Sequence, residues 1–146
     1  MPKIRHAVPG DGEAIREVYA SAAGRGAALD EAHLDRLIRD GALLVAEGAA
    51  GVIGFGSMEA GAAENIRWLY VLPGHQGGGV GSELLKRLEG AGWEAGLNSI
   101  RLHAAPGAVG FYLRHGYREA APGVGVRHDH DGVEMVKERG REGGSG

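Results

Sequence analysis

Hydrophobic and polar positions alternate in residues 3–8, a period that predicts a first β-strand. Apolar residues then recur at helical spacing over residues 12–22 and again over residues 30–38, which predicts two consecutive helices. Gly41 comes soon after the second helical pattern, where a left-handed residue commonly ends a helix. The first part of the chain therefore predicts a strand followed by two helices.

Three further apolar runs predict a hairpin and a third strand. Residues 42–47 and 52–58 flank a short, glycine-bounded turn, as the two arms of a β-hairpin do. Gly54 and Gly56 interrupt the second run, which predicts that another group packs close to the backbone there. Residues 64–72 form the next predicted strand, and this strand leads directly into a glycine-rich segment.

The second half of the chain alternates between helical and strand patterns. The predicted elements are a helix over 80–95, a strand over 99–104, a short helix over 107–115, and strands over 117–120 and 133–137. The whole order is β-α-α-β-β-β-α-β-α-β-β. This order predicts a mixed α/β fold in which helices flank a central sheet.

Length and composition narrow the classes of protein. A chain of 146 residues fits one domain, which we place at residues 1–138, with a disordered, charged and glycine-rich tail at 139–146. The absence of cysteine excludes disulfides, thiolate metal sites and cysteine nucleophiles. A net charge of −3 argues against nucleic-acid binding, and no apolar run is long enough to span a bilayer. With no signal-peptide pattern, we expect a cytoplasmic protein without nucleic-acid or membrane partners.

The segment with the clearest chemistry is residues 76–82, Gln-Gly-Gly-Gly-Val-Gly-Ser, between a predicted strand and a predicted helix. Glycine backbone followed by a helix N-terminus predicts a phosphate or pyrophosphate site. A Walker A loop would need a lysine, but Ser82 follows Gly81 directly. A dinucleotide-binding fingerprint would need a glycine at its sixth position, which is missing here. Nucleotide hydrolysis and dinucleotide binding are therefore both disfavoured.

A third pattern, Gln/Arg-x-x-Gly-x-Gly/Ala, fits residues 76–81, and the sequence Leu-Tyr-Val-x-Pro precedes it. Residues 108–117, Ala-Val-Gly-Phe-Tyr-Leu-Arg-His-Gly-Tyr, fit a second motif, Ala-x-x-Phe/Leu-Tyr-x-x-x-Gly-Phe/Tyr. With these motifs and the order of elements, residues 3–138 resemble the GNAT superfamily of acetyl-CoA-dependent N-acetyltransferases. The resemblance implies acetyl transfer from acetyl-CoA to a primary amine, of a small molecule or a peptide or protein, by direct attack in a ternary complex.

The same resemblance implies where acetyl-CoA binds. The loop amides would hold the pyrophosphate, and the preceding strand would pair with the pantetheine arm, with the Val71 amide as oxyanion donor. Family members often carry Asn or Ser where this chain has Ala105, so one side-chain hydrogen bond to the cofactor is missing. The cofactor-binding residues implied are Leu69, Tyr70, Val71, Gln76, Gly77, Gly78, Gly79, Val80, Gly81 and Ser82.

Two residues receive catalytic roles from the resemblance. Tyr112 matches the tyrosine that protonates the departing thiolate, and Glu64 matches a glutamate that serves as base for the amine in many family members. His130 is a rival base, and water is another. His128 and His130 could also be metal ligands, but no third ligand is suggested, so no metal is predicted.

Two questions stay open at the level of sequence. A domain of this kind could bind CoA or a partner without turnover, although the retained Tyr112 argues for catalysis. The oligomeric state is not set by the sequence, and dimers are common among similar proteins, so a homodimer stays an option. The identity of the amine is also open.

Overall fold

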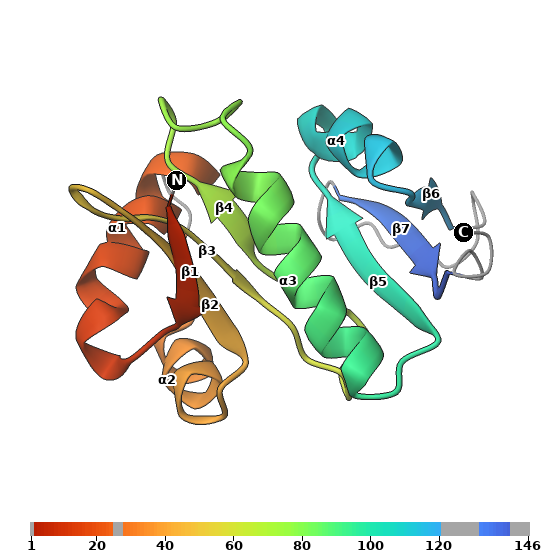
Figure 1. Cartoon of the computed structure of the whole chain (residues 1–146), viewed down its shortest axis with the longest axis horizontal. Coiled ribbons are helices and arrows are strands. Elements are labelled where there is room, and N and C mark those ends of the chain that lie inside the picture. Colours follow the sequence, from red (N-terminus) through yellow and green to blue (C-terminus); the bar gives the residue numbers. More distant parts are fainter. Residues whose placement is uncertain (1, 25–27, 121–131, 141–146) are drawn as a thin grey trace.

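A computed structural model of the chain describes residues 2–24, 28–120 and 132–140. Its mixed α/β architecture, with helices on both sides of strands, confirms the predicted fold class (Figure 1). The elements are β1 (Lys3–His6), η1 (Pro9–Asp11), α1 (Gly12–Ala23), α2 (Glu31–Arg39), β2 (Leu43–Gly48), β3 (Gly51–Ser57), β4 (Leu69–Val71), α3 (Val80–Glu94), β5 (Ser99–Ala104), η2 (Pro106–Ala108), α4 (Val109–Arg114), β6 (Arg118–Glu119) and β7 (Val133–Glu138), where η1 and η2 are single 3₁₀ turns.

The strands are hydrogen-bonded in two groups. The first is a four-stranded sheet in the order β1-β2-β3-β4, and the second is a three-stranded sheet in the order β5-β7-β6. All neighbouring strands within each sheet are antiparallel. A parallel bridge between Ile66 and Leu102 connects the two sheets, which then diverge, with β4 and β5 on either side of α3 in the view of Figure 1.

Each face of the first sheet has its own hydrophobic core. On β2, Leu43 and Val45 join the core with α1 and α2, whereas Leu44 and Ala46 join the core with α3. This alternation follows from the period of two in a strand. Helices therefore cover both faces of the sheet, and the core under α3 also includes residues of the second sheet.

Helix α3 lies directly on β3 at its two interior glycines, as the sequence predicted. A Cβ atom at Gly56 would lie 2.7 Å from Leu88 Cδ1 and 3.2 Å from the Trp68 carbonyl oxygen. A Cβ atom at Gly54 would lie 3.0 Å from the Tyr70 carbonyl oxygen. Such contacts are too close for an unperturbed side chain, so these glycines set the distance between helix and strand.

Gly56→Ala is expected to lower the free energy of unfolding by about 1–3 kcal/mol, because the added methyl group overpacks the contact with Leu88. The measurement is urea-induced unfolding followed by circular dichroism. Gly90→Ala is the matched control: Gly90 is exposed on α3 with open space around it, and the substitution should raise stability by about 0.5–1 kcal/mol. Equal effects of the two substitutions would contradict close packing at Gly56.

The strand predicted over residues 64–72 is shorter than expected, because β4 covers Leu69–Val71 alone. Ahead of it, the Asn65 N–H donates to the carbonyl of Arg101, on β5, at 2.9 Å, so the segment pairs with the second sheet before it reaches β3. Ile66 belongs to the core under α3 and Trp68 to the opposite core, although residues two apart in a regular strand point to the same side.

The end of the described chain is anchored rather than loose at Arg139, which the sequence assigned to the tail. Its backbone N–H donates to the Asn98 carbonyl at 2.8 Å, and its guanidinium donates to the carbonyls of Leu97 and Trp93. The guanidinium carbon also lies 5.8 Å from the centre of the Trp93 ring. Residues 141–146, the rest of the predicted tail, lie outside the described residues.

Candidate functional site

A cavity of about 560 Å³ lies where β4, the following loop, the start of α3 and α4 meet. It contains most of the predicted cofactor-binding residues and Tyr112, together with residues that the sequence did not single out. The lining residues are Leu69, Val71, Gln76, Gly77, Gly79, Gly81, Ser82, Gly107, Ala108, Phe111, Tyr112, Arg114 and His115. Of the remaining predicted residues, Gly78 is exposed, Val80 is buried, and Tyr70 packs on the opposite side of β4 against Tyr19 and Phe55.

The backbone of β4 faces the divergence between the sheets. The Leu72 N–H donates to the Ile53 carbonyl at 2.8 Å. Hydrogen-bonded and non-hydrogen-bonded positions alternate along an antiparallel pair, so the N–H and C=O groups of Leu69 and Val71 point away from β3. The Gln76 side chain donates to the Val71 carbonyl at 3.0 Å, which ties the loop to this edge. The edge of β4 can therefore pair with an extended amide chain.

The glycine loop delivers backbone N–H groups to the same cavity. Gly77 and Gly79 have φ angles of +90° and +89°, a region that favours glycine. The Glu83 N–H donates to the Gly79 carbonyl at 3.0 Å, so the N–H groups of residues 80–82 precede the first helical bond of α3. A helix leaves these N–H groups without intrahelical acceptors, at the positive end of its dipole. This end of the cavity fits a phosphate group.

Tyr112 forms the buried wall of the cavity. It is 7% exposed, and its ring packs edge-on against Phe111 and Tyr117, with centroids 5.1 and 5.5 Å away. Burial raises the pKa of Tyr112, and the nearby Tyr70 and Glu64 raise it further. The phenol therefore keeps its proton at neutral pH and can donate a hydrogen bond inside the cavity.

The buried tyrosines predict a loss of stability at alkaline pH. Burial raises the pKa of both Tyr112 and Tyr117 above the ordinary value of 10.0. In the unfolded chain they ionise near that value while the folded protein keeps the protons, so stability is fully present below about pH 10 and falls above it. Urea unfolding at about pH 9 and about pH 11 measures this fall. Tyr117→Phe should reduce the fall, and an unchanged slope in that variant would contradict the assignment.

Glu64 lies beside the cavity rather than in its lining. Its Oε2 is 3.2 Å from Nδ1 of His103 on β5, and about a third of each side chain is exposed. The negative charge of the carboxylate contributes to the raised pKa of both Tyr70 and Tyr112. It therefore acts electrostatically on side chains on both sides of β4. No local sequence pattern pairs Glu64 with His103, because the two residues come together only through the bridge between the two sheets.

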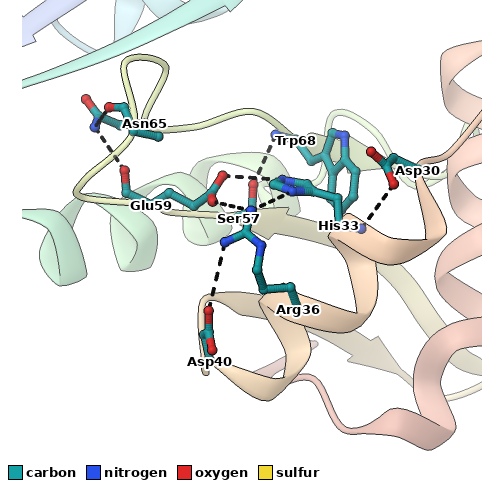
Figure 2. Close-up of polar contacts among 9 residues, drawn as sticks. Asp30, His33, Arg36, Asp40, Ser57, Glu59, Asn65 and Trp68 are labelled. Atoms are coloured by element: carbon teal, nitrogen blue, oxygen red, sulfur yellow. Dashed lines mark hydrogen bonds and ion pairs between the residues drawn. The ribbon is translucent and has the colours of Figure 1, made fainter.

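A hydrogen-bonded cluster holds the segment that leads to β4 (Figure 2). The Arg36 guanidinium donates to His33 Nδ1 at 2.8 Å and to Glu59 Oε2 at 3.2 Å. His33 Nε2 lies 3.3 Å from Glu59 Oε1, and its ring packs edge-on against Trp68. Ser57 Oγ accepts from the Trp68 N–H at 3.2 Å. These contacts tie α2 to the start and the end of the connection between β3 and β4.

Helix α4 contributes residues that sequence reasoning missed. Phe111, Arg114 and His115 line the cavity, and their spacing of three and four places them on one side of the helix. His115 Nε2 lies 2.9 Å from Ser82 Oγ, and its Nδ1 lies 2.8 Å from the Phe111 carbonyl oxygen. The helical spacing, taken together with the position of Tyr112, was the signal that could have placed these side chains beside the loop.

Some predicted features fall where the structure gives no description. His128 and the rival base His130 lie outside the described residues. Within the described ranges, no group of three or more His, Cys, Asp or Glu side chains is arranged to hold a metal ion. The helices of the described part are all too short or too polar to cross a membrane.

Comparison with known proteins finds similarity to acetyltransferases. The acetyltransferase (GNAT) domain family matches residues 39–119, more than half of the chain. An uncharacterized N-acetyltransferase of Bacillus subtilis, YjcF, is 44% identical over 48 residues, which are 33% of this chain and 34% of that protein, so the match spans about a third of that relative.

Solved structures share the fold. A GCN5-related N-acetyltransferase from Rhodopseudomonas palustris superposes with a TM-score of 0.77 at 22% identity, covering 95% of this chain and 96% of that one. The PaiA N-acetyltransferase of Thermoplasma acidophilum, crystallised with coenzyme A, superposes with a TM-score of 0.71 at 19% identity over 95% and 99% of the two chains. With the domain match over residues 39–119, these observations show that the chain belongs to the GNAT acetyltransferase family.

Proposed function

We propose that this protein transfers the acetyl group of acetyl-CoA to a primary amine of a small molecule or a peptide. The observation that carries the proposal is the convergence of three features on one cavity: the glycine loop, the outward backbone edge of β4, and the buried phenol of Tyr112. Each has a separate use in acetyl transfer, and the family match supports their combination.

The residues present fit acetyl-CoA. The N–H groups of residues 77–82 and the N-terminus of α3 would hold the pyrophosphate, and the outward N–H and C=O groups of Leu69 would pair with the pantetheine amides. When bound, acetyl-CoA supplies a thioester whose carbonyl carbon the amine nitrogen attacks, with departure of the thiolate. The Val71 N–H points away from β3 and would act as a donor to that carbonyl oxygen.

Two side chains would handle the protons. Tyr112 would donate its phenolic hydrogen to the leaving sulfur, and its raised pKa favours a hydrogen bond over early, complete transfer. Glu64, held by His103, would accept the proton released by the amine, directly or through water. Glu64 is near enough to Tyr112 for its charge to raise the pKa of that phenol. This proximity to the proposed acid supports Glu64 as the base.

The proposal is tested by calorimetry with acetyl-CoA and CoA, followed by a thiol-release assay over a panel of amines. Acetyl-CoA is expected to bind, and at least one amine is expected to accelerate release of the thiol. Binding without release on any amine would favour a CoA-binding module without turnover. Failure to bind either form of CoA would contradict both interpretations.

Glu64→Gln is expected to lower kcat/KM about tenfold near neutral pH, because the substitution removes the proton acceptor while the side chain keeps nearly the same size and shape. The acidic limb of the pH–rate profile should weaken while the affinity for CoA stays within about twofold. Glu94→Gln, at an exposed position in the last turn of α3, is a charge-matched comparison for the assay. An unchanged rate and profile in Glu64→Gln would transfer the role to His130 or to water.

A further inference from the structure

The ring of His115 faces the first turn of α3 from the end of α4. Its Nδ1 lies 2.8 Å from the Phe111 carbonyl oxygen, and its Nε2 lies 2.9 Å from Ser82 Oγ. A carbonyl oxygen can only accept, so Nδ1 carries a hydrogen. In the neutral ring, Nε2 then has a lone pair and accepts the hydrogen of the Ser82 hydroxyl.

This arrangement commits the hydrogen of Ser82 to the histidine. A hydroxyl has one hydrogen to donate, so Ser82 offers only lone pairs to a group that enters the cavity, and lone pairs repel an anion. Protonation of His115 reverses the bond, because Nε2–H then donates to Ser82 Oγ. The hydroxyl hydrogen is released and can donate to a phosphate oxygen.

The charged and titratable groups around the ring come from α3 and α4. Arg114 lines the same cavity, and Ser82, the hydrogen-bond partner of the ring, lies in the positive first turn of α3. Tyr112 is the other titratable residue among the lining side chains described, and Glu83 is the acidic residue of the first turn of α3. A pyrophosphate at the helix N-terminus would add negative charge and favour protonation of the ring.

We propose that binding of CoA is coupled to uptake of one proton by His115, which turns the Ser82 hydroxyl toward the pyrophosphate. The inference rests on the proposed function. Protonated His115 would place a positive charge beside the loop over residues 76–82, which contains no lysine or arginine. His115 is thus a positioning residue that acts through Ser82. The affinity for CoA should consequently increase as the pH falls from about 8 to about 6.

The test is calorimetry in pairs of buffers with different ionisation enthalpies, which counts the protons taken up on binding. The probe is 3′-dephospho-CoA, whose pyrophosphate does not titrate in this range, so protons are not exchanged by its phosphates. The wild-type protein should take up a large fraction of one proton at about pH 7.5. Its Kd should fall by up to about tenfold for each unit by which the pH is lowered, the limit for uptake of one proton.

His115→Gln keeps hydrogen-bonding groups near Ser82 without a titrating charge, and should bind with no proton uptake and a flat pH dependence. Ser82→Ala should weaken binding and its pH dependence together. His75→Gln is the matched control, because His75 is an exposed loop histidine outside the cavity lining, and its uptake should equal that of the wild type. Tight binding with equal proton uptake in the wild type and in His115→Gln would contradict the role of His115 and leave the proposed function standing. Absence of binding in the wild type would overturn the proposed function as well.

Discussion

Tyr112→Phe is expected to lower kcat about 10²-fold while the Kd for CoA stays within about twofold. The phenol is buried in the cavity wall, and burial raises its pKa, so the wild-type side chain is a fully protonated donor at neutral pH. If Tyr112 acts as proposed, removal of the oxygen would take away stabilisation of the leaving thiolate and would leave the proposed contacts of the loop with CoA in place. Residual activity should persist, since positioning of the reactants supplies part of the acceleration.

The measurement is the steady-state rate of thiol release with the best amine of the panel, together with calorimetry for CoA. Tyr117→Phe is the matched control, because Tyr117 is also a buried tyrosine and its ring contacts that of Tyr112, with centroids 5.5 Å apart, yet it does not line the cavity. Its kcat should stay within about twofold of the wild type. Equal losses in the two variants would assign the effect to packing rather than to proton donation.

Asn65→Ala is expected to cost about 3–4 kcal/mol of folding free energy. The side chain is buried, and it accepts from the Arg101 N–H at 2.9 Å while it donates to the carbonyls of Glu59 and Ala62, each at 3.0 Å. Alanine would remove these three part-buried hydrogen bonds and leave the backbone groups without this partner. The loss should be visible in urea unfolding and in a lower melting temperature.

Asn98→Ala serves as the control for this substitution. Asn98 is exposed, and its described contact to Arg139 uses the backbone carbonyl, which alanine retains. Its effect should stay within about 0.5 kcal/mol. Asn65→Asp offers a second comparison, because it keeps the acceptor for Arg101 but loses both donated bonds, and it should be nearly as destabilising as alanine. A mild effect of Asn65→Ala would contradict its role as the link between the two sheets.

Hydrophobic patterning predicted the order of elements because α1, α2 and α3 each bury one face, whereas β2 and β3 are apolar runs that are buried on both faces. Gly54 and Gly56 were also informative, since a glycine inside an apolar strand has few uses other than close approach. The length of β4 was not predictable from the same patterning. It is decided by Asn65, whose hydrogen bonds to Arg101 draw the segment toward β5, and no local pattern reports such a distant partner.

The candidate site was also only partly predictable from the sequence. The loop over residues 76–82 was found because bare backbone before a helix is itself the chemistry of anion binding. His115 was overlooked because a lone histidine has no chemical meaning until its partner is known. Its partner Ser82 lies 33 residues earlier in the chain and is brought to it by the packing of α4 on α3.

The division of the strands into two ladders also bears on local unfolding. Each ladder keeps its own interstrand hydrogen bonds, and the described backbone bonds that join them are gathered near Asn65 and Ile66. The core under α3 also joins them, since it holds Leu44 of the first ladder and Leu102 of the second, so amide protection in each ladder depends on its own hydrogen bonds and on this shared core. A molecule lodged along the edge of β4 with its phosphates against α3 and α4 would contact both units. Its occupancy would add contacts that join the two ladders and would slow amide exchange in both.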